Sequence, residues 1–238
     1  AIGILLGNGW YNHQSTAVWD FHKAPWRARP TFCMDLRITY EDGSIEIVSS
    51  GKSWKTTYSP ITFNSIYTAE HYDANLEQLL WNTINFIDSA WKGVYIRAAP
   101  SPKIVSQTMH PIRYTEEVPA ISLTKINDTT YIYNLGRNIS GVSRIQVQGP
   151  KGTVLYLKHG ERLNEEGRVD QSNIDAHYRP TDNTDPFQTD KVVLSGDKKN
   201  TFMPLFNYKG FQYVEVTSSQ PIELKKKNLV GYFMHSDV

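Results

Sequence analysis

The sequence predicts an all-β protein with little helix, built from two β-sandwich, jelly-roll-like domains. Three observations support this fold class. Short segments in which apolar and polar residues alternate recur along the chain, and turn-forming Gly, Pro, Asn and Asp residues separate them at short intervals. Apolar residues at helical spacing are confined to one short stretch, residues 74–87. No internal repeat of fixed period is visible.

The first part of the chain contains one strong local signal, a β-hairpin from Met34 to Ile47. Apolar and polar residues alternate on both sides of Asp42-Gly43, a pair typical of hairpin turns. Ahead of the hairpin, the apolar pattern of Ala1–Leu6 predicts a strand that begins before the first residue. We infer from it that the sequence is a piece of a longer chain. Residues 12–31 predict a long surface loop. Further short strands are expected at Ser53–Lys55, Ile61–Phe63 and Val94–Ile96.

The stretch from residue 74 to 102 contains the predicted helix and the predicted domain boundary. A short helix is expected because Leu76, Leu79, Leu80 and Ile84 recur at helical spacing. Residues 98–102, with the sequence AAPSP, have the composition of a linker, and all six tryptophans precede them. We therefore predict an N-terminal domain at 1–102 and a second domain at 103–238, forming separate sandwiches.

The second part repeats the pattern of short strands and turns. Phe211–Val216 is apolar on both faces, which predicts a central strand between two packed layers. Residues 164–186 are polar and predict a long loop, and Asp190 is expected to bond backbone amides at a strand start. The other strands are expected at Thr130–Tyr133, Ser143–Val147, Thr153–Leu157, Asp190–Leu194 and Leu229–Phe233.

The composition excludes several classes of protein. The hydrophobic content of 39% is sufficient for real cores, and the net charge of +1 argues against a nucleic-acid partner. No run of 18 apolar residues exists, so no membrane span is predicted. The lone Cys33 excludes an internal disulfide and a thiolate zinc site. The compartment stays open, with a periplasmic or extracellular location favoured.

Several aromatic residues near the N-terminus are candidates for sugar binding. Trp10, Tyr11, Trp19 and Trp26 can form a platform on which the apolar face of a sugar stacks. The alternative is that these rings close the end of a sandwich, which is the more frequent use of such residues.

Glu70, Asp73 and Asn75 form a candidate metal site. If the chain turns here, their oxygens can converge on a hard cation such as calcium. The alternative is that Asp73 caps the helix predicted to follow it. A second set of oxygen ligands, without the spacing of an EF-hand, lies in the polar loop: Asp170, Asn173 and Asp175.

No catalytic residue is predicted in this chain. The doublets Glu116-Glu117 and Glu165-Glu166 are carboxylate pairs, but neighbours on a strand point to opposite faces. A Gly-x-Ser-x-Gly motif is absent, and the seven histidines show no metal-ligand spacing.

The chain resembles bacterial α-L-rhamnosidases in both of its parts. In the first part the resemblance lies in Leu6–Tyr11, Tyr40–Ser44, Ser53–Lys55, Ile66-Tyr67 and Tyr72–Ala74. In the second part, which is similar to the family's concanavalin-like β domain, it lies in Asn134–Asn138, His159–Leu163, Thr189-Asp190, Asn207–Val216 and His235–Asp237.

The resemblance implies β-sandwich modules of a multidomain enzyme that removes terminal α-linked L-rhamnose. In that family a helical barrel follows the β domains and carries the catalytic acid and base, and neither that barrel nor its acidic motif is present in these residues. Glu161 then has two interpretations. It bonds a sugar or braces the barrel, or it pairs with a base such as Arg162 after its strand.

Three hypotheses of function follow from these observations. The first is a set of non-catalytic modules that support and shape the active site of the barrel, with a rhamnose-containing glycan as substrate. The second is a carbohydrate-binding module, assisted by calcium, because some family members carry such a module in their N-terminal β region. The third is a structural interaction domain with no ligand.

Overall fold

The computed structural model describes residues 1–15, 19–99, 101, 103–175, 186–196 and 198–238. The described chain is all-β apart from three short 3-10 helices, η1 (Phe21–Lys23), η2 (Ala74–Leu76) and η3 (Lys226–Asn228), which confirms the predicted class. The strands of the first half are β1 (Asp35–Thr39), β2 (Ile45–Ser49), β3 (Lys55–Thr56), β4 (Ile61–Asn64), β5 (Glu70–Asp73), β6 (Lys92–Gly93) and β7 (Ile112–Pro119). Those of the second half are β8 (Ser122–Asn127), β9 (Thr130–Val147), β10 (Val154–Gly160), β11 (Arg162–Leu163), β12 (Val169–Asp170), β13 (Thr189–Val193), β14 (Asn200–Phe202), β15 (Lys209–Ser218) and β16 (Leu229–Ser236).

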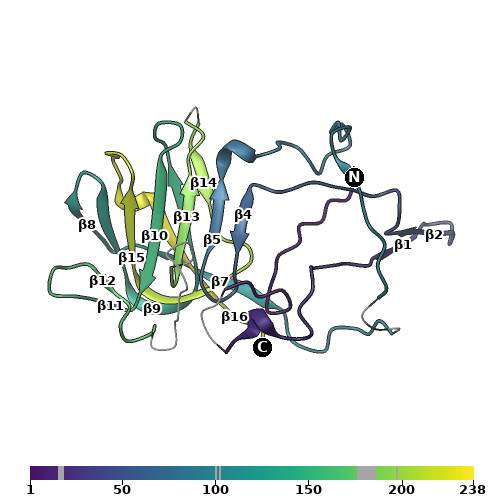
Figure 1. Cartoon of the computed structure of the whole chain (residues 1–238), viewed down its shortest axis with the longest axis horizontal. Helices are drawn as coiled ribbons and strands as arrows, with labels where there is room; N and C mark the ends of the chain where they lie inside the picture. Colours follow the sequence, from purple (N-terminus) through teal and green to yellow (C-terminus); the bar gives the residue numbers. More distant parts are fainter. Residues whose placement is uncertain (16–18, 100, 102, 176–185, 197) are drawn as a thin grey trace.

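One curled sheet of ten strands dominates the molecule (Figure 1). Eight of its strands follow the order β4-β5-β13-β10-β15-β9-β16-β7, and β8 and β14 both pair with β9. Strand β9 joins the layers because its start pairs with β8 and β15, whereas its end pairs with β16 and β14. Gly141 lies where β9 passes closest to β16, and a Cβ atom there would lie 1.8 Å from the Tyr232 carbonyl oxygen. A side chain at this position would therefore force the strands apart.

The hydrophobic core lies inside this curled sheet and draws all of its buried members from Val118 to Leu229. Phe211 has no exposed surface, and its strand β15 pairs with both β9 and β10. The prediction of a central strand at Phe211–Val216 is confirmed. The predicted strands of the second part also form, although Thr130–Tyr133 and Ser143–Val147 are the two ends of the single strand β9.

The two halves of the chain share a sheet, contrary to the expectation of separate sandwiches. Strand β5 pairs in parallel with β13, with His71 opposite Lys191, so the sheet is continuous across residue 102. The linker composition of residues 98–102 did not indicate this, because the contact joins segments far apart in sequence. The domain boundary at residue 102 itself stays a prediction.

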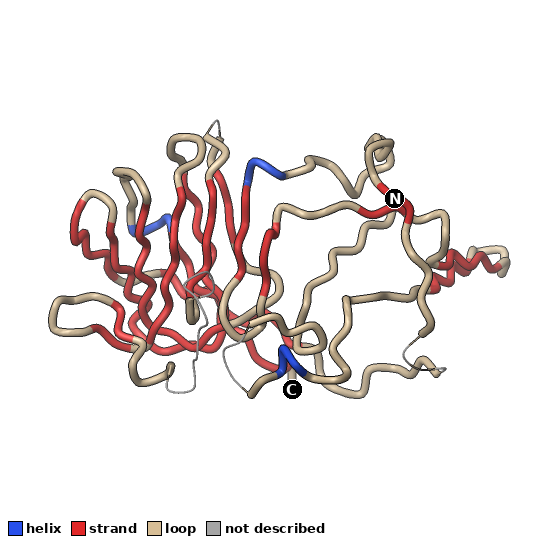
Figure 2. Tube along the Cα trace, in the orientation of Figure 1, coloured by secondary structure: helices blue, strands red, loops and turns tan. Residues whose placement is uncertain are grey.

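The N-terminal part is mostly loop, with two small sheets of its own (Figure 2). The predicted hairpin is confirmed as β1 and β2, and it projects at the end of the molecule opposite the core. The strands expected at Ala1–Leu6 and at Val94–Ile96 are wrong. Ala1–Leu6 have no ladder partner, and β6 ends at Gly93, before Val94. Among the described residues up to 111, the buried apolar side chains are Ala69 and Ala74 alone.

The helix predicted within residues 74–87 is also wrong beyond its first turn. Only η2 forms, and turns follow it. Leu79, Leu80 and Ile84 are 68%, 70% and 85% exposed, so a helix here would have no apolar surface to pack against. In the part of the chain that the structure describes, no helix is long and apolar enough to cross a membrane.

Candidate functional site

An aromatic cluster of Trp10, Trp19, Phe21, Trp26 and Tyr67 lies around η1. The ring centroids of Trp10 and Trp19 are 6.4 Å apart, and each of the two rings also contacts Phe21 and Tyr67. Trp26 joins the cluster through Phe21, at 6.1 Å. Trp19 and Trp26 are 65% and 56% exposed, so the cluster presents flat apolar faces to solvent. Such faces suit the apolar side of a sugar ring.

A buried histidine packs against the aromatic cluster. His13 has no exposed surface and stacks on Trp10 at 5.4 Å. Neither of its ring nitrogens has a hydrogen-bond partner among the described residues. Burial lowers the pKa of His13, and the positive charges of His22 and Arg27 lower it further. The imidazole is therefore held neutral, as a packed aromatic ring.

The aromatic candidates divide into two groups in the structure. Trp10, Trp19 and Trp26 come together in the cluster, whereas Tyr11 is 44% exposed and makes none of its ring contacts. The cluster also reaches the second half of the chain, because Tyr67 lies 5.3 Å from the ring of Phe187. The sequence did not indicate that Phe21 and Tyr67 belong here.

A buried charge cluster of Glu70, Asp190 and Lys209 joins β5, β13 and β15. The three side chains belong to residues 0–3% exposed. Asp190 accepts a hydrogen bond from the backbone N–H of Glu70 at 2.8 Å, which confirms its expected bond to a backbone amide, and its other oxygen lies 2.9 Å from Lys209 Nζ. The Glu70 carboxylate accepts hydrogen bonds from the N–H groups of Leu205 and Phe206.

The environment of Glu70 raises the pKa of its carboxyl group strongly. Burial raises the pKa of Glu70 to about 7, and the negative charge of Asp190 adds to the rise. The two backbone N–H donors and Lys209 oppose the shift but do not cancel it. A carboxyl group that titrates near neutral pH is thus enclosed between the two halves of the chain.

The three residues of the candidate metal site bond to different partners. Asp73 Oδ1 accepts from the backbone N–H of Asn75 at 2.9 Å as the N-cap of η2, so the predicted capping role is confirmed. Asn75 also donates from its side chain to Asp73 and to the carbonyl of Leu194. Within the described residues, no three acidic, histidine or cysteine side chains are grouped so as to hold a metal ion. Glu70 and the Asp73–Asn75 pair thus have separate partners, and a calcium site at these residues stays a prediction.

The acids of the polar loop are engaged by their neighbours. Glu161 accepts from Asn173 Nδ2 at 3.0 Å rather than pairing with Arg162, which binds Asp170 instead. Asp175 belongs to the turn that starts at Gln171. Glu161 makes none of the contacts of the aromatic cluster. The loop residues that lie between 176 and 185 are outside the described chain.

The two glutamate doublets form no facing carboxylate pair. Glu116 forms an ion pair with Arg137, and Glu117 accepts from the Tyr232 hydroxyl at 2.7 Å. Glu165 and Glu166 are exposed in the turn after β11.

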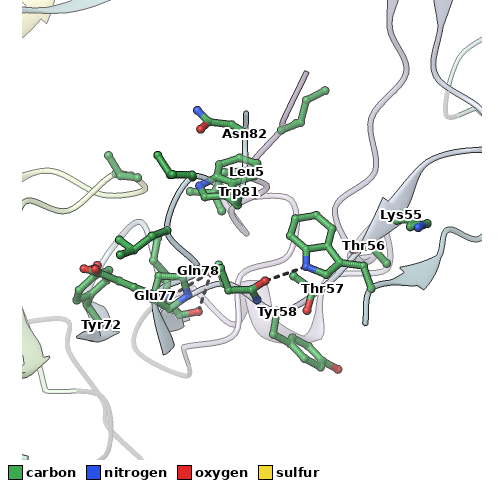
Figure 3. Close-up of a pocket in the computed structure, with 18 residues that line it drawn as sticks. Leu5, Lys55, Thr56, Thr57, Tyr58, Tyr72, Glu77, Gln78, Trp81 and Asn82 are labelled. Atoms are coloured by element: carbon green, nitrogen blue, oxygen red, sulfur yellow. Dashed lines mark hydrogen bonds between the residues drawn. The ribbon is translucent and has the colours of Figure 1, made fainter. Parts of the chain in front are cut away.

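A cavity of about 510 Å³ opens beside β3, β4 and η2 (Figure 3). The indole rings of Trp81 and Trp91 stack at 6.4 Å on one wall, and Trp91 Nε1 donates to Gln78 Oε1 at 2.8 Å. At another wall Tyr72 contacts Glu77, which pairs with Lys198 at 2.6 Å. Sequence patterns do not indicate this cavity, although Trp81 and Trp91 are a local signal for it.

Models of two protein domains match the chain. The α-L-rhamnosidase N-terminal domain matches residues 1–116, and the bacterial α-L-rhamnosidase concanavalin-like domain matches residues 124–235. The chain belongs to the bacterial α-L-rhamnosidase family. It is similar to the curated α-L-rhamnosidases of Streptomyces avermitilis (31% identity over 237 residues, 99% of this chain) and Alteromonas sp. strain LOR (30% over 241 residues, 100% of this chain).

The structure agrees with that of a family member. The crystal structure of Streptomyces avermitilis α-L-rhamnosidase complexed with L-rhamnose superposes with a TM-score of 0.82 at 31% identity, covering 97% of this chain and 21% of that one. The chain spans 22% and 25% of the length of the two curated relatives. The buried charge cluster joins the two matched domains. Glu70 lies in the N-terminal domain, and Asp190 and Lys209 lie in the concanavalin-like domain.

Proposed function

We propose that these residues are non-catalytic β modules of an enzyme that removes terminal α-linked L-rhamnose from glycans. The observation that carries this proposal is that two rhamnosidase domain models account for nearly all of the chain, while the chain spans 22–25% of its curated relatives. The substrate class follows from the relatives' activity as α-L-rhamnosidases. The partner is the remainder of the same polypeptide, with a helical catalytic barrel.

The chemistry of the described acids supports a non-catalytic role. Hydrolysis with inversion needs two carboxyl groups about 6.5–9.5 Å apart, open to the substrate on both sides of the scissile bond. Glu70 and Asp190 are adjacent but completely enclosed, and Glu116 and Glu117 are engaged by Arg137 and Tyr232. The fold can instead present loops and a rigid sheet that shape a neighbouring active site.

The isolated chain should not hydrolyse an aryl α-L-rhamnoside, because it spans only 22% and 25% of the length of its curated relatives, and Glu116 and Glu117 are each engaged by another side chain. A chromogenic aryl α-L-rhamnoside measures this. The release of its chromophore is compared between residues 1–238 and the full-length parent enzyme at equal molar concentration. We expect turnover from the parent alone. Turnover by the fragment that persists through purification and disappears when one of its acids is substituted would overturn the assignment.

A second candidate function is carbohydrate binding by the aromatic cluster. Exposing a tryptophan to water is unfavourable, and Trp19 and Trp26 are 65% and 56% exposed, with Trp10 at 42%. Their faces offer stacking area to a 6-deoxy sugar, whose methyl group enlarges its apolar side. The third hypothesis, a structural domain without a ligand, predicts no binding here.

Calorimetric titration of L-rhamnose, with and without calcium, distinguishes these functions. If the aromatic cluster binds sugar, Trp19→Ala and Trp26→Ala should each weaken binding at least tenfold, because each removes one stacking face. Tyr58→Ala is the matched control, since Tyr58 is 95% exposed and lies at the cavity instead. Asp73→Ala should lower the melting temperature without changing affinity. If no heat of binding is detected with or without calcium, the supporting role remains as the proposed function.

A further inference from the structure

Within the sheet, residues 61–77 meet the second half of the chain through a short pairing. Strand β5 pairs with β13 through three residue pairs, and β4 joins the sheet through β5. Ring contacts of Tyr72 with Phe202 at 5.8 Å and of Tyr67 with Phe187 at 5.3 Å cross this junction. The buried members of the hydrophobic core lie at residues 118–229, and Tyr72 packs against it only partly buried. Apolar burial therefore holds residues 61–77 less firmly than the core strands.

Buried polar bonds make up much of the remaining contact. The backbone N–H of Glu70 on β5 donates to Asp190 on β13, and Asp190 pairs with Lys209 on β15. The Glu70 carboxylate accepts from the amides of Leu205 and Phe206, which precede β15. Lys209 Nζ also donates to Asn207 Oδ1 at 2.6 Å. Buried charges are stable only while each keeps its partners, so the loss of one member leaves the others unpaired in a dry site.

We propose that the cluster of Glu70, Asp190 and Lys209 is a latch: it holds residues 61–77 on the β13 edge of the sheet, and breaking it releases this segment while the core strands stay folded. The release is local because β15 pairs with both β10 and β9, and these three strands contribute to the core without β4 and β5. Opening the latch would free residues 61–77 to move relative to the concanavalin-like domain.

Hydrogen exchange of residues 1–238, followed by mass spectrometry of peptides, tests the latch. The first variant, Lys209→Met, removes the cation and leaves two carboxylates. The second, Asp190→Asn, keeps the shape of the side chain and removes the charge that pairs with Lys209, so it serves where the first fails to fold. The matched control is Glu77→Gln, an acid of the same segment whose ion pair with Lys198 is partly exposed.

With the latch broken, peptides that cover residues 61–77 should exchange at least tenfold faster, while peptides from β10 and β15 change less than twofold. Glu77→Gln should leave both sets within twofold of wild type. Equal acceleration of all peptides in Asp190→Asn would overturn the proposal, because the cluster would then be an ordinary part of the core. Unchanged exchange of residues 61–77 in this variant would overturn it as well.

Discussion

Replacing Phe211 with alanine should lower the free energy of unfolding by about 3–5 kcal/mol. The ring is completely buried in the core, and it meets the edge of His159 at 4.7 Å between centroids. Its strand is bonded to β9 and β10, so the backbone around the cavity cannot collapse to fill the lost volume. The cost therefore includes both the lost burial and the empty space.

Urea denaturation followed by far-UV circular dichroism measures this effect. Tyr208→Ala is the control, because Tyr208 is 49% exposed and only three positions earlier, and it should change the free energy of unfolding by less than about 0.5 kcal/mol. A loss below 1 kcal/mol for Phe211→Ala would mean that the ring is not part of the core.

Ionisation of Glu70 should make the protein less stable as the pH rises from about 4.5 to about 7. The folded state raises the pKa of Glu70 from 4.5 to about 7, chiefly through burial and then through Asp190. The folded state thus holds this proton more tightly than the unfolded state, so stability is greatest below pH 4.5 and falls until pH 7 is passed. The full contribution is about 3 kcal/mol.

Three histidines act in the opposite direction: the buried His13 and His159 and the half-buried His71. Burial lowers the pKa of His71 and of His159 to about 4, so both favour the folded state as the pH rises. The measurement must therefore compare wild type with Glu70→Gln, in which the histidines are unchanged. The unfolding free energy of the wild type minus that of Glu70→Gln should decrease from pH 4.5 to pH 7.5. A constant difference would show that Glu70 does not titrate in this range.

Local sequence patterns predicted the elements whose pairing is also local. The β1–β2 hairpin follows from alternation around Asp42-Gly43, and Gly43 has the positive φ of 80° that its turn requires. The burial of Phe211 follows from a strand that is apolar on both faces. Residues 74–87 show the limit of this reasoning, because their helical spacing has no surface to pack against.

Contacts between distant segments could not be predicted. The partners of Glu70 lie 120 to 136 positions away in the sequence, so nothing near residue 70 indicates whether the carboxylate meets a cation, an amide or water. Capping by Asp73 was predictable because its partner is two residues away. The aromatic cluster was found in part, since Trp10, Trp19 and Trp26 are close in sequence whereas Tyr67 is not.

The parallel pairing of β5 with β13 fixes the order in which the chain can acquire its structure. Lys191 is 120 residues beyond its partner His71, so β5 has no strand to join until that much more polypeptide has been synthesised. At ordinary rates of translation this takes roughly 6–24 s. The N-terminal segment, with its exposed leucines and isoleucines, emerges first and docks last. For that interval it depends on chaperones or on its own solubility.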